Sequence, residues 1–230
     1  MRRAEVVHLG RMAYVPCWEL QKEYHRKRLA GEVHDTLLLV EHDPVLTLGA
    51  NFHAENLLLS PEEYERRGIE VVRTDRGGDV TYHGPNQLVL YPIFDLREQG
   101  RDLHRFIRNL EETMIVALRE FGLDAYRFPP NTGVWVNERK IAAIGIKVSR
   151  WVSLHGIALN CNNDLSPFSL IVPCGIREYP VTSLTRECGR DVTIEEAAAP
   201  AIRAFAEVFG LEFSASDVAP PAAQPQQPTP

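Results

Sequence analysis

The sequence predicts an α+β domain built on a mixed or antiparallel sheet flanked by helices. Short apolar or β-branched runs, which are typical of strands, outnumber the stretches with helical periodicity. The runs also lack the regular alternation with helices that a parallel βαβ fold would show. The candidate strands are residues 5–9, 36–42, 45–49, 69–74, 87–94, 132–136, 140–148 and 153–160.

Helical periodicity is clearest in residues 16–30, 103–121 and 193–209. Pro16 stands near the first turn of the first helix, where a missing N–H costs nothing. Thr193 followed by Glu196 has the spacing of a capping box at the start of the last helix. Asn137-Glu138 between two apolar runs indicates a tight hairpin turn.

Length and composition indicate one catalytic domain followed by a tail. The chain has 230 residues, of which 44% are hydrophobic, enough for a sizeable core. We assign residues 1–213 to a single domain. Residues 214–230 contain five prolines and a single charge. Because such a segment buries too little apolar surface to offset the entropy of ordering, we expect it to be disordered.

Charge and cysteine usage exclude several classes of function. The net charge of −6 argues against a nucleic-acid binder. No apolar run has the length of a signal peptide core or a membrane span, so we expect a cytoplasmic protein with no membrane attachment. The cysteines at 17, 161, 174 and 188 include no C-x-x-C pair, so we expect reduced thiols and no metal site. Signatures of dinucleotide, P-loop, zinc-protease and serine-hydrolase sites are absent.

The first candidate segment is residues 76–87, RGGDVTYHGPNQ. Gly77 and Gly78 allow the backbone to take positive φ and to approach a ligand closely. Tyr82 and His83 add polar groups beside another glycine. The alternative is a pair of ordinary turns around a short strand, and the spacing alone does not separate the two.

The second candidate segment is residues 139–147, RKIAAIGIK, followed by residues 153–160, SLHGIALN. Alanines and glycine leave space over a sheet for a ligand, and the isoleucines supply an apolar wall. Lys140 and Lys147 are an odd number of residues apart, so on one continuous strand they point to opposite faces and only one enters a shared pocket. The alternative for either lysine is a solvated strand residue.

The third candidate segment is residues 170–176, LIVPCGI. Proline and glycine around Cys174 fix a tight turn after an apolar run, which can present the thiol beside exposed backbone amides. A nucleophilic cysteine needs partial exposure and a nearby cation, because the thiolate is the reactive form. The alternative is a packed turn cysteine. Cys17, Cys161 and Cys188 lack a comparable setting.

These three segments, in this order, resemble the octanoyl-[acyl-carrier-protein]:protein octanoyltransferases, or lipoyl(octanoyl) transferases. The resemblance rests on RGGDVTYHGPNQLVLYP, then TGVWV, RKIAAIGIKV and SLHGIALN, then DLSPF, IVPCGI and VTSL. It runs from about His42 to Leu184. That family shares its fold with lipoate- and biotin-protein ligases, so the resemblance implies a catalytic module of that kind, consistent with the α+β prediction.

The resemblance also implies roles for individual residues. Cys174 matches the nucleophile that carries the acyl group as a thioester, and Lys140, rather than Lys147, matches the lysine that lowers the pKa of the thiol. The implied substrate-binding residues are Arg76, Gly77, Gly78, Asp79, Val80, Thr81, Tyr82 and His83, together with Ala143, Ile144, Gly145, Gly156, Ile157 and Ala158.

The implied reaction uses two protein-borne substrates and no cofactor, metal or ATP. The Cys174 thiolate takes octanoyl from octanoyl-acyl carrier protein, and the acyl group then passes to a lysine of a lipoyl domain. The implied acceptors are the lipoyl domains of 2-oxoacid dehydrogenases and the glycine cleavage H protein. Because carrier proteins are generally acidic, the basic run at residues 25–28 offers a docking patch, or simply a solvated helix face.

Two rival functions are compatible with the same fold. An ATP-dependent lipoate or biotin ligase activates a free acid as an acyl-adenylate and needs no nucleophilic cysteine. A non-catalytic module that binds an acyl group or its carrier would have the same pocket with an inert Cys174.

Overall fold

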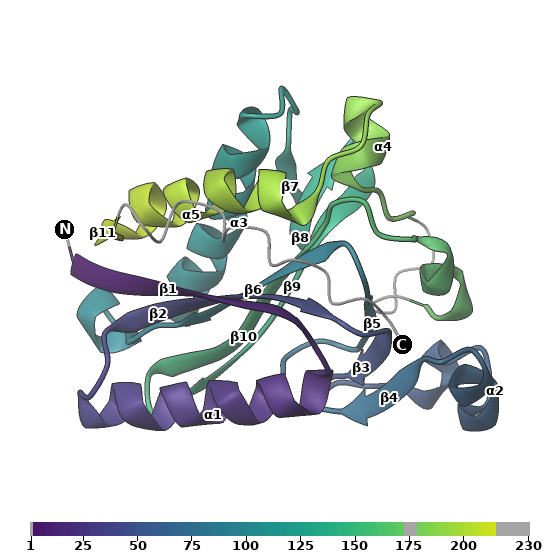
Figure 1. Ribbon diagram of the computed structural model, residues 1–230, viewed down its shortest axis with the longest axis horizontal. Helices are drawn as coiled ribbons and strands as arrows, with labels where there is room; N and C mark the ends of the chain where they lie inside the picture. Colours follow the sequence, from purple (N-terminus) through teal and green to yellow (C-terminus); the bar gives the residue numbers. More distant parts are fainter. Residues whose placement is uncertain (1, 173–178, 215–230) are drawn as a thin grey trace, which may run out of the picture.

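The computed structural model describes residues 2–172 and 179–214 and contains two sheets (Figure 1). The strands are β1 (Arg2–Met12), β2 (Asp35–His42), β3 (Val45–Leu48), β4 (Glu70–Arg73), β5 (Val80–His83), β6 (Gln87–Ile93), β7 (Tyr126–Phe128), β8 (Asn131–Val136), β9 (Arg139–Ser149), β10 (Val152–Asn160) and β11 (Leu211–Glu212). The large sheet has the order β11-β1-β2-β6-β10-β9-β8-β7, and the small one β4-β3-β5. Parallel pairs join β1 to β2, β1 to β11 and β3 to β4, and the other pairs are antiparallel. The predicted mixed sheet is confirmed.

Helices cover both faces of the large sheet. They are α1 (Tyr14–Ala30), α2 (Pro61–Arg66), α3 (Leu103–Arg119), α4 (Leu184–Cys188) and α5 (Ile194–Phe209), with 3-10 turns η1 (Ala54–Asn56), η2 (Leu96–Gln99) and η3 (Ser166–Leu170). Helices α3 and α5 pack on each other and on one face of the sheet, and α1 packs on the other face (Figure 1). The small sheet lies beside α2 and η3.

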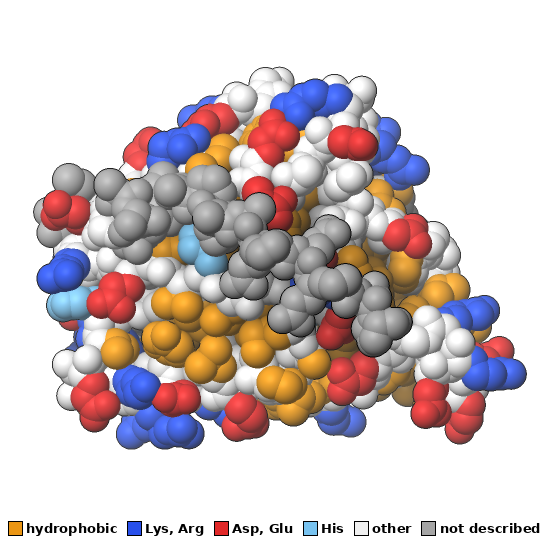
Figure 2. Space-filling model, in the orientation of Figure 1, with side chains coloured by type: hydrophobic (Ala, Val, Ile, Leu, Met, Phe, Trp, Pro, Cys, Tyr) orange, Lys and Arg blue, Asp and Glu red, His pale blue; other side chains and the backbone are white. Residues whose placement is uncertain are grey.

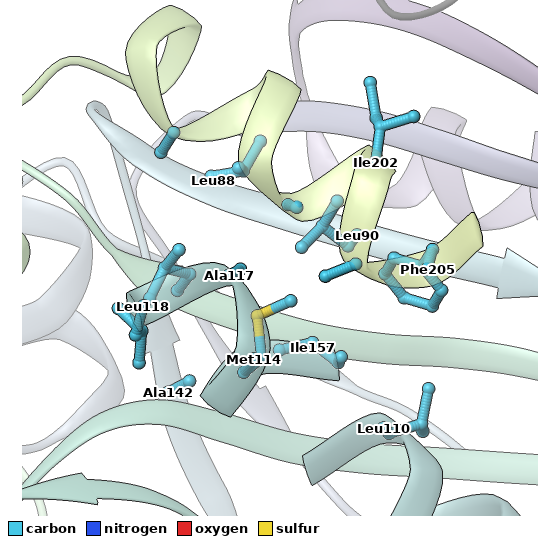
Figure 3. Close-up of a cluster of buried hydrophobic side chains, with 14 of the residues drawn as sticks. Leu88, Leu90, Leu110, Met114, Ala117, Leu118, Ala142, Ile157, Ile202 and Phe205 are labelled. Carbon is cyan, nitrogen blue, oxygen red and sulfur yellow. The ribbon is translucent and has the colours of Figure 1, made fainter. Parts of the chain in front are cut away.

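The central strands are buried on both faces because helices lie on each side. On β6, Leu88 and Leu90 point toward α3 and α5, whereas Val89 and Tyr91 point toward α1. Figure 3 shows the first of these cores, in which Met114 of α3 meets the sheet and α5. Burial on both faces explains why residues 87–94 form an almost continuous apolar run.

The three predicted helices and the predicted hairpin are present. The Thr193 hydroxyl accepts a hydrogen bond from the Glu196 backbone N–H at 3.2 Å, as a cap requires. The Glu196 carboxylate instead binds Arg190, so only half of the capping box forms. Asn137 and Glu138 have φ of 49° and 62°, the geometry of a two-residue hairpin turn between β8 and β9.

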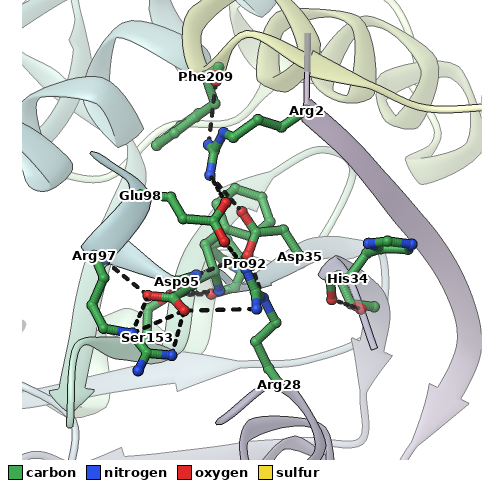
Figure 4. Close-up of polar contacts among 12 residues, drawn as sticks. Arg2, Arg28, His34, Asp35, Pro92, Asp95, Arg97, Glu98, Ser153 and Phe209 are labelled. Carbon is green, nitrogen blue, oxygen red and sulfur yellow. Dashed lines mark hydrogen bonds and ion pairs between the residues drawn. The ribbon is translucent and has the colours of Figure 1, made fainter. Parts of the chain in front are cut away.

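The basic run at residues 25–28 on α1 is partly compensated by carboxylates and partly buried. His25 is buried, and its ring bonds the Ser149 carbonyl oxygen. The Arg28 guanidinium donates at 2.8 Å to Asp35 and at 2.8 Å to Glu98 (Figure 4). Figure 2 shows acidic and basic side chains mixed along the edge of the molecule formed by α1.

Cys174 and residues 215–230 of the predicted tail lie outside the described residues. Among the helices of the described ranges, none combines the length and apolar character needed to cross a membrane.

Candidate functional site

Arg76 anchors the loop that joins β4 to β5. Its side chain is buried, and its guanidinium donates to the backbone oxygens of Thr47 and Asp79, the second at 2.8 Å. Its Nε also donates to the Thr47 hydroxyl at 3.0 Å. Since a guanidinium has five donors in a rigid plane, these bonds fix the loop against β3 of the small sheet.

Two glycines let this loop lie directly on β9 of the large sheet. Gly78 has φ of +89°, a conformation that other residues rarely adopt. A Cβ at Gly145 would lie 3.0 Å from the carbonyl oxygen of Gly77. The Gly77 N–H donates to the Ile146 carbonyl oxygen at 2.8 Å. The first and second candidate segments therefore meet backbone to backbone.

The two halves of the second segment are direct neighbours across a hairpin. In the β9–β10 ladder, residues 143, 144 and 145 pair with residues 158, 157 and 156, respectively. Small residues therefore face small residues at both ends of this three-residue stretch, which opens space above the sheet.

This space contains two small adjoining cavities, of about 40 Å³ and 20 Å³. At about 10–15 Å³ per water molecule, the larger has room for about three waters. The two share Thr81, Ala143 and Ala158. The larger is lined by Tyr14, Arg76, Gly77, Gly78, Thr81, His83, Val89, Tyr91, Ala143, Ile144, Gly145, His155, Gly156, Ile157 and Ala158.

Lys140 lines the smaller cavity and is 8% exposed. Its backbone N–H donates to the Pro180 carbonyl oxygen at 3.0 Å, and its own carbonyl oxygen accepts from the Thr182 N–H at 2.9 Å. Its Nζ lies 5.0 Å from the centroid of the Trp135 ring. Lys140 is thus fixed beside the chain that follows residues 173–178.

Lys147, on the same strand, has a different environment. Its side chain is 39% exposed, and its Nζ donates to an Asp75 carboxylate oxygen at 2.6 Å. It lines neither cavity. Of the two lysines, only Lys140 borders the space beside the small residues.

Five residues of the 76–83 segment line the larger cavity, and three do not. Thr81 and His83 point toward it, while Val80 and Tyr82 alternate to the other face of β5 and join the core of the small sheet. Asp79 is buried, and its carboxylate accepts hydrogen bonds from neighbouring loop residues. Val80 and Tyr82 therefore pack in the small sheet, Asp79 binds loop residues, and none of the three lines these two cavities.

Sequence reasoning missed Tyr14 of α1, which lines the larger cavity, and the polar residues that it contacts. The Tyr14 hydroxyl bonds His155 Nδ1 at 3.3 Å, and His155 Nε2 bonds Asp75 at 2.7 Å. The pKa of Asp75 is lowered by the hydrogen bond from His155 and then by Lys147, so its carboxylate is charged. Tyr14 lies in the first turn of a helix whose residue pattern gives no sign of a site, so no local signal identified it.

His83, which lines the larger cavity, and the neighbouring His42 are both neutral at pH 7. Burial lowers the pKa of His83 to about 3 and that of His42 to about 4. His83 Nδ1 bonds the Gln87 amide oxygen at 2.8 Å, which leaves Nε2 beside the Thr47 hydroxyl. Across residues 2–172 and 179–214, no group of three or more His, Cys, Asp or Glu side chains is placed to hold a metal ion.

Comparison with known proteins identifies the family. The chain is 52% identical over 203 residues to an octanoyltransferase of Rubrobacter xylanophilus, which covers 87% of this chain and 91% of the relative. The chain belongs to the octanoyltransferase family. An octanoyltransferase of Solibacter usitatus is 49% identical over 213 residues, covering 93% and 96% of the two chains. Octanoyltransferases are acyltransferases, so the predicted enzyme class is confirmed.

The octanoyltransferase family belongs with the lipoate ligases in fold. A family model described as lipoyl protein ligase A/B catalytic domain matches residues 13–206. The fold is also similar to a solved bi-partite lipoate protein ligase from Thermoplasma acidophilum. That match has a TM-score of 0.72 at 21% identity and covers 93% of this chain and 85% of the other. The prediction of a lipoate ligase-like catalytic module is confirmed.

Proposed function

We propose that this octanoyltransferase takes its acyl group from octanoyl-acyl carrier protein and passes it to a lysine of a lipoyl domain through a thioester on Cys174. The position of Lys140 carries the proposal. It is a buried lysine that lines the smaller cavity. That cavity adjoins the small residues at positions 143, 145, 156 and 158 of β9 and β10, here called the small-residue wall. Its backbone bonds Pro180 and Thr182, on the segment that follows Cys174 in sequence.

The first half-reaction forms the thioester. An ammonium beside the thiol favours the thiolate by charge pairing. The Cys174 thiolate attacks the carbonyl carbon of the acyl-carrier thioester, and the bond from that carbon to the carrier sulfur breaks. The departing carrier thiolate takes a proton from the Lys140 ammonium and leaves as a thiol. Octanoyl-Cys174 and a neutral Lys140 remain.

The second half-reaction transfers the acyl group to the acceptor lysine. That lysine has an ordinary pKa of about 10.4 and must first release one proton to solvent. Its amine attacks octanoyl-Cys174, the carbon–sulfur bond breaks, and the second proton of the amine returns Lys140 to the ammonium form. Lys140 is favoured over His83 as the proton acceptor because burial makes His83 a weak base and both of its ring nitrogens face neighbouring polar groups.

Intact-protein mass spectrometry after incubation with octanoyl-carrier protein, without ATP, tests the proposal. We expect one octanoyl adduct that maps to Cys174, is absent in Cys174→Ser, and disappears when a lipoyl domain is added. Octanoylation of an added lipoyl domain that requires free octanoate and ATP, with no adduct on the enzyme, would indicate a ligase instead. The absence both of the adduct and of lipoyl-domain octanoylation under either condition would indicate a non-catalytic binding module.

A further inference from the structure

The chain just before Cys174 is held by residues 56–58. Leu57 and Ile171 form an antiparallel bridge, and the Val172 N–H donates to the Asn56 carbonyl oxygen at 2.9 Å. The Leu58 N–H donates to the Leu170 carbonyl oxygen at 3.2 Å. Cys174 follows Val172 by two residues in the sequence.

Asn56 also binds the loop that lines the acyl cavity. Its side chain is buried, and its Nδ2 donates to an Asp79 carboxylate oxygen at 2.6 Å. The other Asp79 oxygen accepts from the backbone N–H of Val80 at 2.8 Å and from that of His53 at 3.2 Å. His53 Nδ1, on a largely exposed ring, lies 3.1 Å from the Asp79 oxygen that Asn56 binds.

Asp79 in turn is a rigid part of that loop. Its carbonyl oxygen accepts from the Arg76 guanidinium at 2.8 Å and from the Gly49 N–H at 2.9 Å. It directly follows Gly77 and Gly78, which line the larger cavity. Two hydrogen bonds through Asn56 therefore connect the cavity loop to Val172.

We propose that Asn56 and Asp79 are positioning residues that set the segment bearing Cys174 relative to the acyl cavity. The inference rests on the proposed function, since it gives Cys174 the role of nucleophile. Neither residue lines either of the two cavities described above. Both act through their neighbours: Asp79 through the loop backbone, and Asn56 through its main-chain bond to Val172. A side-chain substitution at residue 56 leaves that main-chain bond in place and removes only the link to Asp79.

The rate of Cys174 octanoylation in a single turnover, followed by mass spectrometry, tests the proposal. We expect Asn56→Leu and Asn56→Asp to slow this step by about tenfold or more, because small misplacements of reacting groups cost up to about a hundredfold. Binding of a non-reactive octanoyl thioether of the carrier should change by less than about threefold, since the cavity lining is intact. Asn56→Ser truncates the side chain and provides the same test if Asn56→Leu does not fold.

Exchanging the two residues separates positioning from general destabilisation. In Asn56→Asp with Asp79→Asn, the amide at 79 donates to the carboxylate at 56, and its oxygen remains available to the Val80 N–H. We expect the pair to recover the rate to within about threefold of the wild type, while each single variant stays slow. Thr113→Val is the matched control, because it removes a buried hydrogen bond within α3 at a residue that lines neither cavity.

The outcomes distinguish this inference from the proposed function. If the wild type forms no adduct on Cys174, the proposed function fails. If the wild type reacts and folded Asn56 variants react at the same rate, or if Thr113→Val slows the step equally, the positioning role is refuted. Loss of analogue binding with an unchanged step would also overturn it, because Asn56 would then act on the cavity itself.

Discussion

Replacing Ala143 with leucine adds three carbons at the point where the two cavities meet. Ala143 and its cross-strand partner Ala158 line both cavities, which measure about 40 Å³ and 20 Å³. An octanoyl tail passing this point requires either overpacking, at about 1–3 kcal/mol, or withdrawal of terminal methylenes, at about 0.8 kcal/mol each. Both costs grow with chain length. Since about 1.4 kcal/mol corresponds to tenfold in rate, we expect the preference for octanoyl over butanoyl to fall by about tenfold or more.

Competition between octanoyl- and butanoyl-carrier protein measures this preference directly. Ala206→Leu is the matched control, since it adds the same carbons on a partly buried position of α5, outside the lining of both cavities. Thermal unfolding shows whether each variant is folded. An unchanged preference in a folded Ala143→Leu protein would mean that the acyl chain runs elsewhere, and an equal change in the control would mean that the effect is not local.

Two further predictions concern the cysteines and the buried histidines. Iodoacetamide near neutral pH should alkylate Cys174 first, and Lys140→Met should slow that reaction; peptide mapping that finds Cys174 the slowest would contradict the assignment. The other thiols should react later, because burial raises the pKa of Cys17 and of Cys161 to about 12 and raises that of the half-buried Cys188. Acid should also destabilise the fold. In the folded protein the pKa of His42 is lowered to about 4 and that of His83 to about 3. In the unfolded chain the same histidines bind protons from about pH 6.5 downward, so acid favours unfolding. The free energy of unfolding should therefore fall by up to about 2 kcal/mol per histidine between pH 7 and pH 5 and level off below the folded values; urea midpoints equal at pH 7 and pH 5 would refute this.

Local chemistry made much of the fold predictable from sequence. The turn at Asn137-Glu138, the cap at Thr193 and the apolar run of β6 each depend on neighbouring residues, and all three are present in the structure. The alternation of β-strand side chains also predicted that at most one of Lys140 and Lys147 could enter a shared pocket. Only Lys140 lines a cavity. The resemblance, and not the spacing, had favoured Lys140 of the two.

Contacts between distant segments were not predictable in this way. Tyr14 reaches the cavity from α1, and Asn56 binds Asp79 from a turn that carries no motif. Strand alternation could have indicated that Val80 and Tyr82 face away from Thr81 and His83, but the start of β5 was not known. The sequence also did not show that Arg28, in the basic run at residues 25–28, is paired, because its carboxylate partners come from residues 35, 95 and 98.

The β9–β10 hairpin places the two halves of the small-residue wall within one continuous stretch of chain. Its turn at Arg150 and Trp151 has positive φ at both residues, a geometry that closes hairpins locally. Contacts of short sequence separation form early in folding, so this wall can assemble before the loop at Arg76 arrives from the small sheet. Because both halves lie in one stretch of sequence, the hairpin can be exchanged between proteins as a single segment. Exchanging residues 142–159 between relatives would move both halves of the wall together, with the β9–β10 register that pairs them.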